Sequence, residues 1–109
     1  MASTFKVLGQ ADPLAATLTT AYTVPLATEA VVSSLVVANR SATPTSFRIA
    51  VSPGGAGVAN EHYIYYDVAI AANDVFAATL GIAMEASSIV RVYATLATLS
   101  FNIFGQEIT

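Results

Sequence analysis

Apolar and polar residues alternate with a period of two along most of the chain, a pattern typical of β-strands with one buried face. In TSFRIAV, residues 45–51, Phe47 and Ile49 fall on one face and Arg48 on the other. Turn-forming Pro, Gly, Asn and Asp residues separate the alternating stretches. The pattern predicts strands at residues 4–10, 17–24, 29–39, 45–51, 61–70, 74–82, 87–95 and 98–108.

Eight short strands at regular spacing predict an all-β fold. We expect an antiparallel eight-stranded β-sandwich, jelly-roll-like, in which residues 1–109 form a single domain. The long β-branched stretch 29–39 is predicted to be a central strand, buried on both faces over much of its length.

Two segments leave the arrangement of strands open. Residues 74–82 are compatible with a strand, but Asn73 could also cap a helix that runs to Glu85, although Gly81 disfavours it. KVLGQ near the beginning and IFGQE near the end both place Gly-Gln after an apolar stretch. This similarity could mark two terminal strands that pair with each other or a true repeat, which differ in contacts and not in sequence.

The composition indicates that much of the surface is covered. Hydrophobic residues make up 55% of the 109 residues and charged residues 10%, whereas an ordinary domain has about 25% charged residues. The mean hydropathy is +0.65. No stretch approaches the roughly 18 apolar residues of a spanning helix, and MASTFKVLGQ lacks the features of a secretory signal. We therefore expect contacts with copies of the chain or with other proteins, and none with a membrane.

The distribution of charge and the absence of cysteine exclude several classes of partner and site. The four basic residues, Lys6, Arg40, Arg48 and Arg91, form no run, which argues against a nucleic-acid partner. The net charge is −3, and no acidic tail is present. Without cysteine there is no disulfide, thiolate zinc site or thiol nucleophile.

The stretch EHYIYYD, residues 61–67, holds the only histidine and three of the five tyrosines. In a regular strand one face would carry Glu61, Tyr63, Tyr65 and Asp67. His62 would lie on the opposite, apolar face, away from both carboxylates. Because a metal site needs three or four converging donors, His62 is predicted to be a packed or interface residue.

The sequence predicts no catalytic, cofactor-binding or metal-binding residues. No serine lies in a G-x-S-x-G elbow, and the single histidine has no polar neighbours on its face. PGGAG at 53–57 resembles a phosphate loop, but it lacks the following Lys-Ser/Thr and helix. We interpret residues 52–60 as an exposed loop between two strands. Paired carboxylates of the kind glycosidases use have no supporting context.

A partner interface is the remaining interpretation of the polar residues. Tyrosine suits surfaces that are partly buried and partly wet, and its ring can also stack on a sugar. Arg48 and Arg91 lie in apolar stretches, where they could pair with Asp67 or Glu61 within or between subunits. The predicted interface consists of Glu61, Tyr63, Tyr65, Asp67, Arg48 and Arg91.

Several stretches together resemble a group of small proteins encoded in tailed bacteriophages, including phages of marine and freshwater bacteria. These stretches are KVLGQ, TLTTAYTVP, VVSSLVVANRS, FRIAV, HYIYYDVAIAAND, VRVYA and SFNIFGQEIT, which span almost the whole chain. The resemblance implies a β-sandwich component of the virion that is present in many copies, with no catalytic residues to carry over.

The expected function is therefore a non-enzymatic structural protein that decorates the phage capsid as a homo-oligomer, for which we expect a trimer. Its partners would be copies of itself and the major capsid protein. The alternative is a tail, baseplate or fibre protein that adheres to host glycans through Tyr63 and Tyr65. A third possibility is a small β-sandwich enzyme or sugar-binding domain outside any virion.

Overall fold

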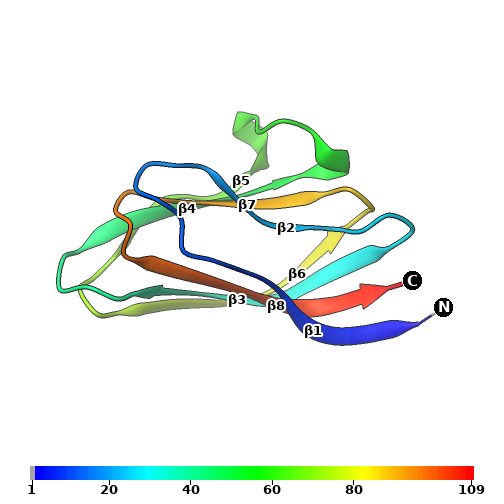
Figure 1. Ribbon diagram of the computed structural model, residues 1–109, viewed down its shortest axis with the longest axis horizontal. Coiled ribbons are helices and arrows are strands. Elements are labelled where there is room, and N and C mark those ends of the chain that lie inside the picture. The colour runs from blue at the N-terminus through cyan, green and yellow to red at the C-terminus, as the bar shows by residue number, and fades with distance from the viewer. Residues whose placement is uncertain (1) are drawn as a thin grey trace.

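The computed structural model describes residues 2–109 as two four-stranded antiparallel sheets packed face to face (Figure 1). The strands are β1 (Ser3–Ala11), β2 (Thr19–Thr23), β3 (Glu29–Asn39), β4 (Thr45–Ser52), β5 (Tyr63–Ile70), β6 (Val75–Met84), β7 (Ile89–Ala94) and β8 (Leu99–Ile108). Two short 3-10 helices, η1 (Pro53–Gly55) and η2 (Asn60–His62), lie between β4 and β5.

The order of the strands is that of a jelly roll. Sheet A has the order β1-β8-β3-β6, and sheet B has the order β2-β7-β4-β5. Every connection crosses from one sheet to the other except β4–β5, which stays within sheet B. The predicted eight-stranded antiparallel β-sandwich is confirmed.

The two segments whose arrangement the sequence left open both form β-strands, each paired with a neighbouring strand. The segment that also suited a helix forms β6, which pairs with β3 from Val75 opposite Ala38 to Met84 opposite Ala30. Strand pairing places its alternate side chains, such as Phe76, against the core, whereas a helix would have broken this alternation. The terminal strands also pair, with Lys6 of β1 opposite Gly105 of β8. The pairing suggested by the two Gly-Gln motifs is thus confirmed.

Strand β3 is central, as predicted, but it is not buried on both faces. Its inward residues Val32, Leu35 and Val37 are buried between the sheets. The outward residues Val31 and Val36 are only half-buried, because no second layer covers this side of sheet A. The prediction that residues 29–39 form a central strand is therefore confirmed, whereas the prediction that both faces of this strand are buried is wrong.

The core lies between the two sheets and centres on Phe47 of β4, which is fully buried. Its ring packs against Phe76 of β6 at 5.2 Å and against Phe101 of β8 at 6.1 Å between centroids. These tilted and edge-on arrangements are the ones that aromatic rings favour. One aromatic residue thus joins strands from both sheets.

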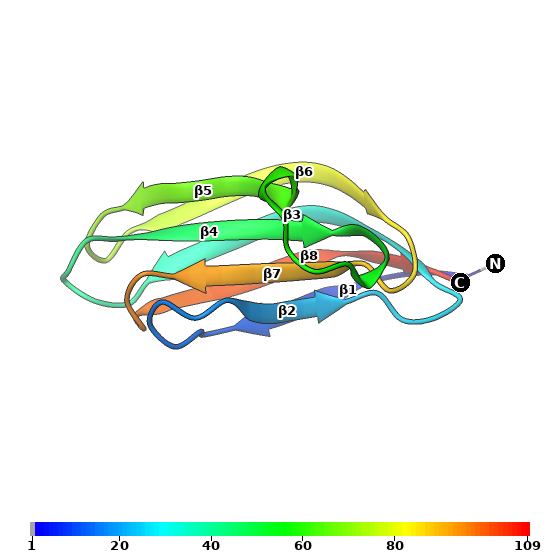
Figure 2. The same ribbon diagram turned by 90° about the horizontal axis from the view of Figure 1, so that it is seen from above.

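The loops gather at the two ends of the sandwich, as Figure 2 shows. At one end, buried Asn39 donates from Nδ2 to the carbonyl oxygens of Thr43, at 2.9 Å, and Ala71, at 3.1 Å. At the other end the two termini lie side by side, joined by backbone bonds between Ala2 and Thr109.

The segment of residues 53–62 rises from this second end and stands over the outer face of sheet B (Figures 1 and 2). Within it, η1 contacts β7 and η2 contacts β4. Arg91 of β7 holds the segment, because its Nη1 donates to Ser52 Oγ at 2.8 Å and to the Ala56 carbonyl at 3.1 Å. The predicted exposed loop is thus a partly ordered segment tied to the sheet.

Candidate functional site

The outer face of sheet A, here called the A face, is made of the side chains of β1, β8, β3 and β6 that point away from sheet B. It consists of Ser3, Phe5, Val7, Gln10, Glu29, Val31, Ser34, Val36, Ala38, Val75, Ala77, Thr79, Ala83, Ser100, Asn102, Phe104, Gln106 and Ile108. Within residues 2–109, Glu29 is the only charged residue among these strand side chains, and it lies at one end. Asp12 and Arg40 border the A face elsewhere, in a depression that they line together with Gln10, Ser100 and Asn102. Lys6 and Glu107, on neighbouring positions, point to the other side of sheet A.

Large apolar side chains are exposed on the A face. Phe5 is 81% exposed, Val75 55% and Val7 45%. The solvated face of an antiparallel sheet is ordinarily polar, so the large exposed apolar side chains on this face are unusual. Four strands of about ten residues cover roughly 600 Å² of sheet, near the ~800 Å² that each partner contributes to a stable interface. The A face therefore has the chemistry and size of a contact surface.

The outer face of sheet B has a different character, set by a β-bulge in β5. Between Tyr65, which pairs with Ile49, and Val68, which pairs with Phe47, two residues of β5 lie opposite the single residue Arg48. Asp67 in this bulge has a positive φ of 52°. The bulge turns Tyr65 into the core and Tyr66 out to the surface, where Tyr66 is 57% exposed.

Arg48 is the centre of the resulting group, here called the Arg48 cluster: Arg48, Tyr63, Tyr66, Asp67 and Tyr93. The guanidinium carbon lies 4.2 Å from the ring centroid of Tyr66 and 4.4 Å from that of Tyr93. Nε donates to Asp67 Oδ1 at 2.6 Å, and Nη2 donates to Oδ2 at 3.4 Å. The bond to Asp67 raises the pKa of Arg48 above its ordinary value, so the cluster keeps a fixed ion pair between aromatic rings.

The structure brings together only part of the predicted interface. Arg48 and Asp67 form the predicted ion pair within the chain. Tyr63 stays outward, because a second register shift in β5 places it opposite Ala50 while Tyr65 lies opposite Ile49. Its ring forms a T-shaped pair with Tyr66, with 5.0 Å between centroids. The prediction that Glu61, Tyr63, Tyr65 and Asp67 share one face is wrong. Tyr65 packs on Phe47 and Phe76 in the core, and Glu61 lies in η2 before the strand begins.

Arg91 and His62 make polar contacts that hold the 53–62 segment in place. Arg91 bonds to Ser52 and Ala56 instead of a carboxylate. The backbone N–H of Ala59 donates to His62 Nδ1 at 3.0 Å, and Ser52 Oγ lies 3.5 Å from the same nitrogen. His62 lies in η2 before β5 begins, so the prediction that it lies on the apolar face of a strand is wrong. Its ring instead helps to shape the turn through these polar contacts.

Tyr66 and Tyr93 are the members of the cluster that the sequence did not identify. The signal for Tyr93 was present, because it lies two residues after Arg91 and so shares its strand face. The signal for Tyr66 was hidden, because regular alternation places it on the wrong side of β5.

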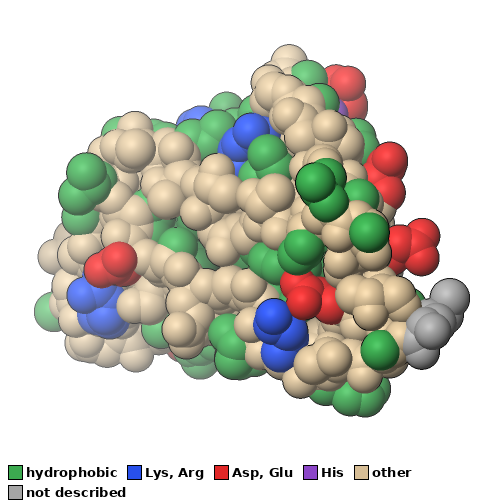
Figure 3. All heavy atoms as spheres, turned by 45° about the vertical axis from the view of Figure 1, so that its right-hand side comes forward, with side chains coloured by type: hydrophobic (Ala, Val, Ile, Leu, Met, Phe, Trp, Pro, Cys, Tyr) green, Lys and Arg blue, Asp and Glu red, His purple; other side chains and the backbone are tan. Residues whose placement is uncertain are grey.

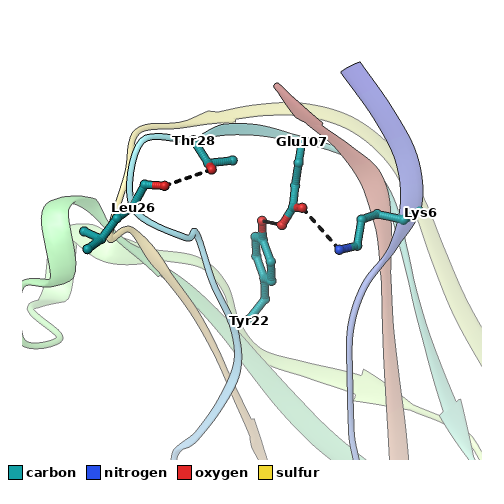
Figure 4. A network of polar contacts seen from close by, with 5 residues as sticks. All are labelled: Lys6, Tyr22, Leu26, Thr28 and Glu107. Atoms are coloured by element: carbon teal, nitrogen blue, oxygen red, sulfur yellow. Dashed lines mark hydrogen bonds and ion pairs between the residues drawn. The ribbon is translucent and has the colours of Figure 1, made fainter. Parts of the chain in front are cut away.

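A third polar group fastens the edge where β1 and β2 meet (Figure 4). The hydroxyl of Tyr22, on β2, donates to Glu107 Oε2 on β8 at 2.6 Å, and Lys6 Nζ of β1 lies 3.2 Å from Glu107 Oε1. The bond from Tyr22 is the main cause that lowers the pKa of Glu107, and Lys6 lowers it further. Burial, followed by the bond to Glu107, raises the pKa of Tyr22 above its usual range. The group links sheet B to sheet A.

The Tyr22→Phe variant is expected to be less stable by about 1–2 kcal/mol at pH 7, because it loses a hydrogen bond to a charged acceptor. Because the pKa of Glu107 is lowered in the folded chain, the stability that the Tyr22–Glu107 bond contributes is complete above the ordinary carboxyl pKa of about 4.3. This stability is lost as the pH falls through the lowered pKa of the folded chain. Because the pKa of Tyr22 is raised in the folded chain, the native chain keeps its full stability below about pH 10 and becomes less stable as the pH rises further. Tyr22→Phe has no hydroxyl to ionise and should not show this decrease. Urea unfolding from pH 3 to pH 11 measures both changes; a stability difference that does not vary with pH would contradict the assignment.

Other features of the described chain offer no comparable site. Two shallow depressions have volumes of about 340 and 260 Å³, the first beside Arg40 and Asn102 and the second beside Glu29 and Met84. In the part of the chain that the structure describes, no three His, Cys, Asp or Glu side chains lie close enough to hold one metal ion. No described helix has the length and apolar character needed to cross a membrane.

The charged side chains lie in small separate groups on the side of the molecule seen in Figure 3, where the 53–62 segment stands above the rest of the surface. The A face and the Arg48 cluster are thus the two surfaces with a distinct character, on opposite sides of the sandwich. Comparison of the chain with protein-family models, curated proteins and solved structures finds no match.

Proposed function

We propose that this chain is a non-enzymatic structural protein of a tailed-bacteriophage virion, which decorates the capsid surface as a homo-oligomer. The observation that carries the proposal is the A face, which presents exposed Phe5, Val7 and Val75 and a single charged residue at its end. An exposed sheet face with large apolar side chains and little charge gains free energy when another protein removes it from water. The bacteriophage resemblance of the sequence supplies the setting.

The two sides of the sandwich suit this role. With the A face seated on the capsid shell, the 53–62 segment and the Arg48 cluster on sheet B point away from the particle. In this orientation the segment that the sequence predicts to be an exposed loop faces away from the capsid shell. Contacts among many copies add stability that a domain of this size gains less easily from its own core. A trimer remains the expected oligomer.

A tail, baseplate or fibre location is the alternative, and copy number distinguishes it. Quantitative mass spectrometry of purified particles should find the chain in amounts comparable to the major capsid protein. A ratio typical of a tail part, far below that of the capsid protein, would move the proposal to the tail. Absence of the chain from particles that encode it would overturn the virion role.

Light scattering of the purified chain tests the homo-oligomer separately. We expect one defined species larger than the protomer over a range of concentrations. A protomer that stays monomeric at high concentration would contradict self-association.

A further inference from the structure

Asp67 has a backbone conformation that is unusual for its position in the fold. The other non-glycine residues with positive φ, namely Ala16, Ala27, Asn73 and Ser87, lie in turns, whereas Asp67 lies inside β5. Aspartate tolerates the left-handed region better than most residues, yet the conformation still has a cost. Strain of this kind persists where the surroundings impose it, and it concentrates at functional sites.

The bulge at Asp67 determines what the outer face of sheet B presents. A regular strand would send Tyr66 inward and Tyr65 outward. Instead, the Arg48 guanidinium carbon lies over the Tyr66 ring at 4.2 Å from its centroid, and Arg48 Nε donates to the Asp67 carboxylate. The side chain of Asp67 remains 49% exposed, and Tyr66 is 57% exposed. The local strain thus places an open ring beside an open carboxylate.

The charge of the cluster restricts what can bind there. The guanidinium of Arg48 and the carboxylate of Asp67 neutralise each other at 2.6 Å. A phosphate or another anion would meet the Asp67 carboxylate, and a cation would meet Arg48. The ligand favoured by this pair is an uncharged molecule rich in hydrogen-bonding groups.

The exposed groups define the shape of that ligand. Tyr66 offers an exposed aromatic ring, and Tyr63 lies beside it in a T-shaped pair with 5.0 Å between centroids. Asp67 has lone pairs that accept further bonds, and Nη1 of Arg48 makes no hydrogen bond within residues 2–109. A pyranose ring has an apolar C–H face and a rim of hydroxyls spaced to bond with a planar carboxylate or guanidinium. We propose that the Arg48 cluster binds a neutral saccharide, stacked on Tyr66 with its hydroxyls on Asp67 and Arg48.

This inference does not depend on attachment to the capsid, since the cluster and the A face lie on opposite sides of the sandwich. It also corrects the residues of the glycan hypothesis, because Tyr65 is in the core and Tyr66 takes its place. A neighbouring protein could also use exposed tyrosine and arginine. The fixed ion pair and the small open area favour a small polar ligand.

The test uses the isolated chain and a defined set of probes: methyl glycosides of glucose, galactose, mannose and N-acetylglucosamine, with their linear oligosaccharides. Binding is followed by the ¹⁵N NMR signal of the Arg48 Nε–H and by tyrosine fluorescence, which no tryptophan obscures. We expect at least one oligosaccharide to shift the Arg48 signal at millimolar concentration. The Tyr66→Ala variant should bind it ~10-fold or more weakly, as loss of a stacked ring predicts.

Two further variants keep the test independent of folding. Asp67→Gly removes the carboxylate but suits the positive φ, so the variant should remain folded while binding falls by a similar factor. Phe5→Ala removes an exposed aromatic ring from the A face and should leave binding unchanged. The inference is overturned if no probe shifts the Arg48 signal, or if Tyr66→Ala binds as well as the native chain. It is also overturned if the Tyr66 and Asp67 variants affect only attachment to particles, which would assign the cluster to a protein contact.

Discussion

The Gly105→Ala variant is expected to lose about 3 kcal/mol or more of its free energy of unfolding, the upper range for overpacking. For a domain of this size the loss should lower Tm by roughly 12 °C or more. Gly105 is buried in β8, between β1 and β3. An added Cβ would overlap the backbone carbonyl oxygen of Val31 and come within 3.0 Å of Leu8 Cδ1. A backbone oxygen inside a paired strand cannot move aside cheaply, so the strain should spread through sheet A.

Gly81→Ala is the matched control for this variant. Gly81 lies in β6 of the same sheet, and an added Cβ there meets no atom within 4 Å. Its substitution should change the free energy of unfolding by no more than about 1 kcal/mol, in the stabilising direction, because the unfolded chain loses freedom. Thermal and urea unfolding of both variants measures the difference. Similar stability for the two variants would show that β1, β8 and β3 do not approach as closely as described.

A double variant with lysines on the A face, Ser34→Lys with Ala83→Lys, is expected to abolish attachment to the particle. Both positions point to solvent in the free chain, so folding should be nearly unaffected. In the proposed interface both ammonium groups would be buried against an apolar surface without partners, at a penalty of several kcal/mol each. Affinity for particles that lack the chain should fall by ~100-fold or more, which corresponds to about 2.7 kcal/mol.

The control carries the same two added charges on the other sheet. Thr23→Lys with Ala69→Lys places lysines on the outer face of sheet B, beside Ile89 and Ser46. The net charge of the two double variants is equal, so a general electrostatic effect would weaken or strengthen both alike. Co-sedimentation with particles should show loss only for the A-face variant. Loss for the sheet B variant alone would place the contact on the opposite side.

Strand positions could be predicted from the sequence because alternation reports which residues face a core. Strand β3 occupies the predicted residues 29–39, where two Val-Val pairs make the stretch rich in β-branched side chains. The helix considered for residues 74–85 failed because packing of alternate side chains such as Phe76 outweighed the helix propensity of the alanines. Local helix propensity is weak compared with the hydrogen bonds and packing that a neighbouring strand provides along a whole strand.

The candidate site was only partly predictable, because side-chain direction along β5 depends on a bulge. Regular alternation assigned Tyr65 to the surface and Tyr66 to the apolar side. One additional residue opposite Arg48 reverses both assignments. The pairing of Arg48 with Asp67 survived because the same bulge brings the carboxylate to the guanidinium.

The character of the A face also required the register of four strands. Phe5, Val36 and Phe104 lie far apart in the sequence, and nothing in the composition places them on one side of a sheet. The low proportion of charged residues did indicate that some surface would be covered. The strand pairing shows which surface has almost no charge, and this is the step that a single sequence cannot supply.

Labelling of single cysteines on assembled particles tests most directly whether the A face is the attachment surface. The chain has no native cysteine, so Ser34→Cys on the A face and Ser46→Cys on the outer face of sheet B each introduce one thiol with little change in volume. Both serines are half-buried in the free chain, so both thiols should react with a maleimide before assembly. On particles, we expect Ser34→Cys to be protected while Ser46→Cys still reacts, as attachment through the A face requires. Equal reaction of the two variants on particles, or protection of Ser46→Cys alone, would contradict it.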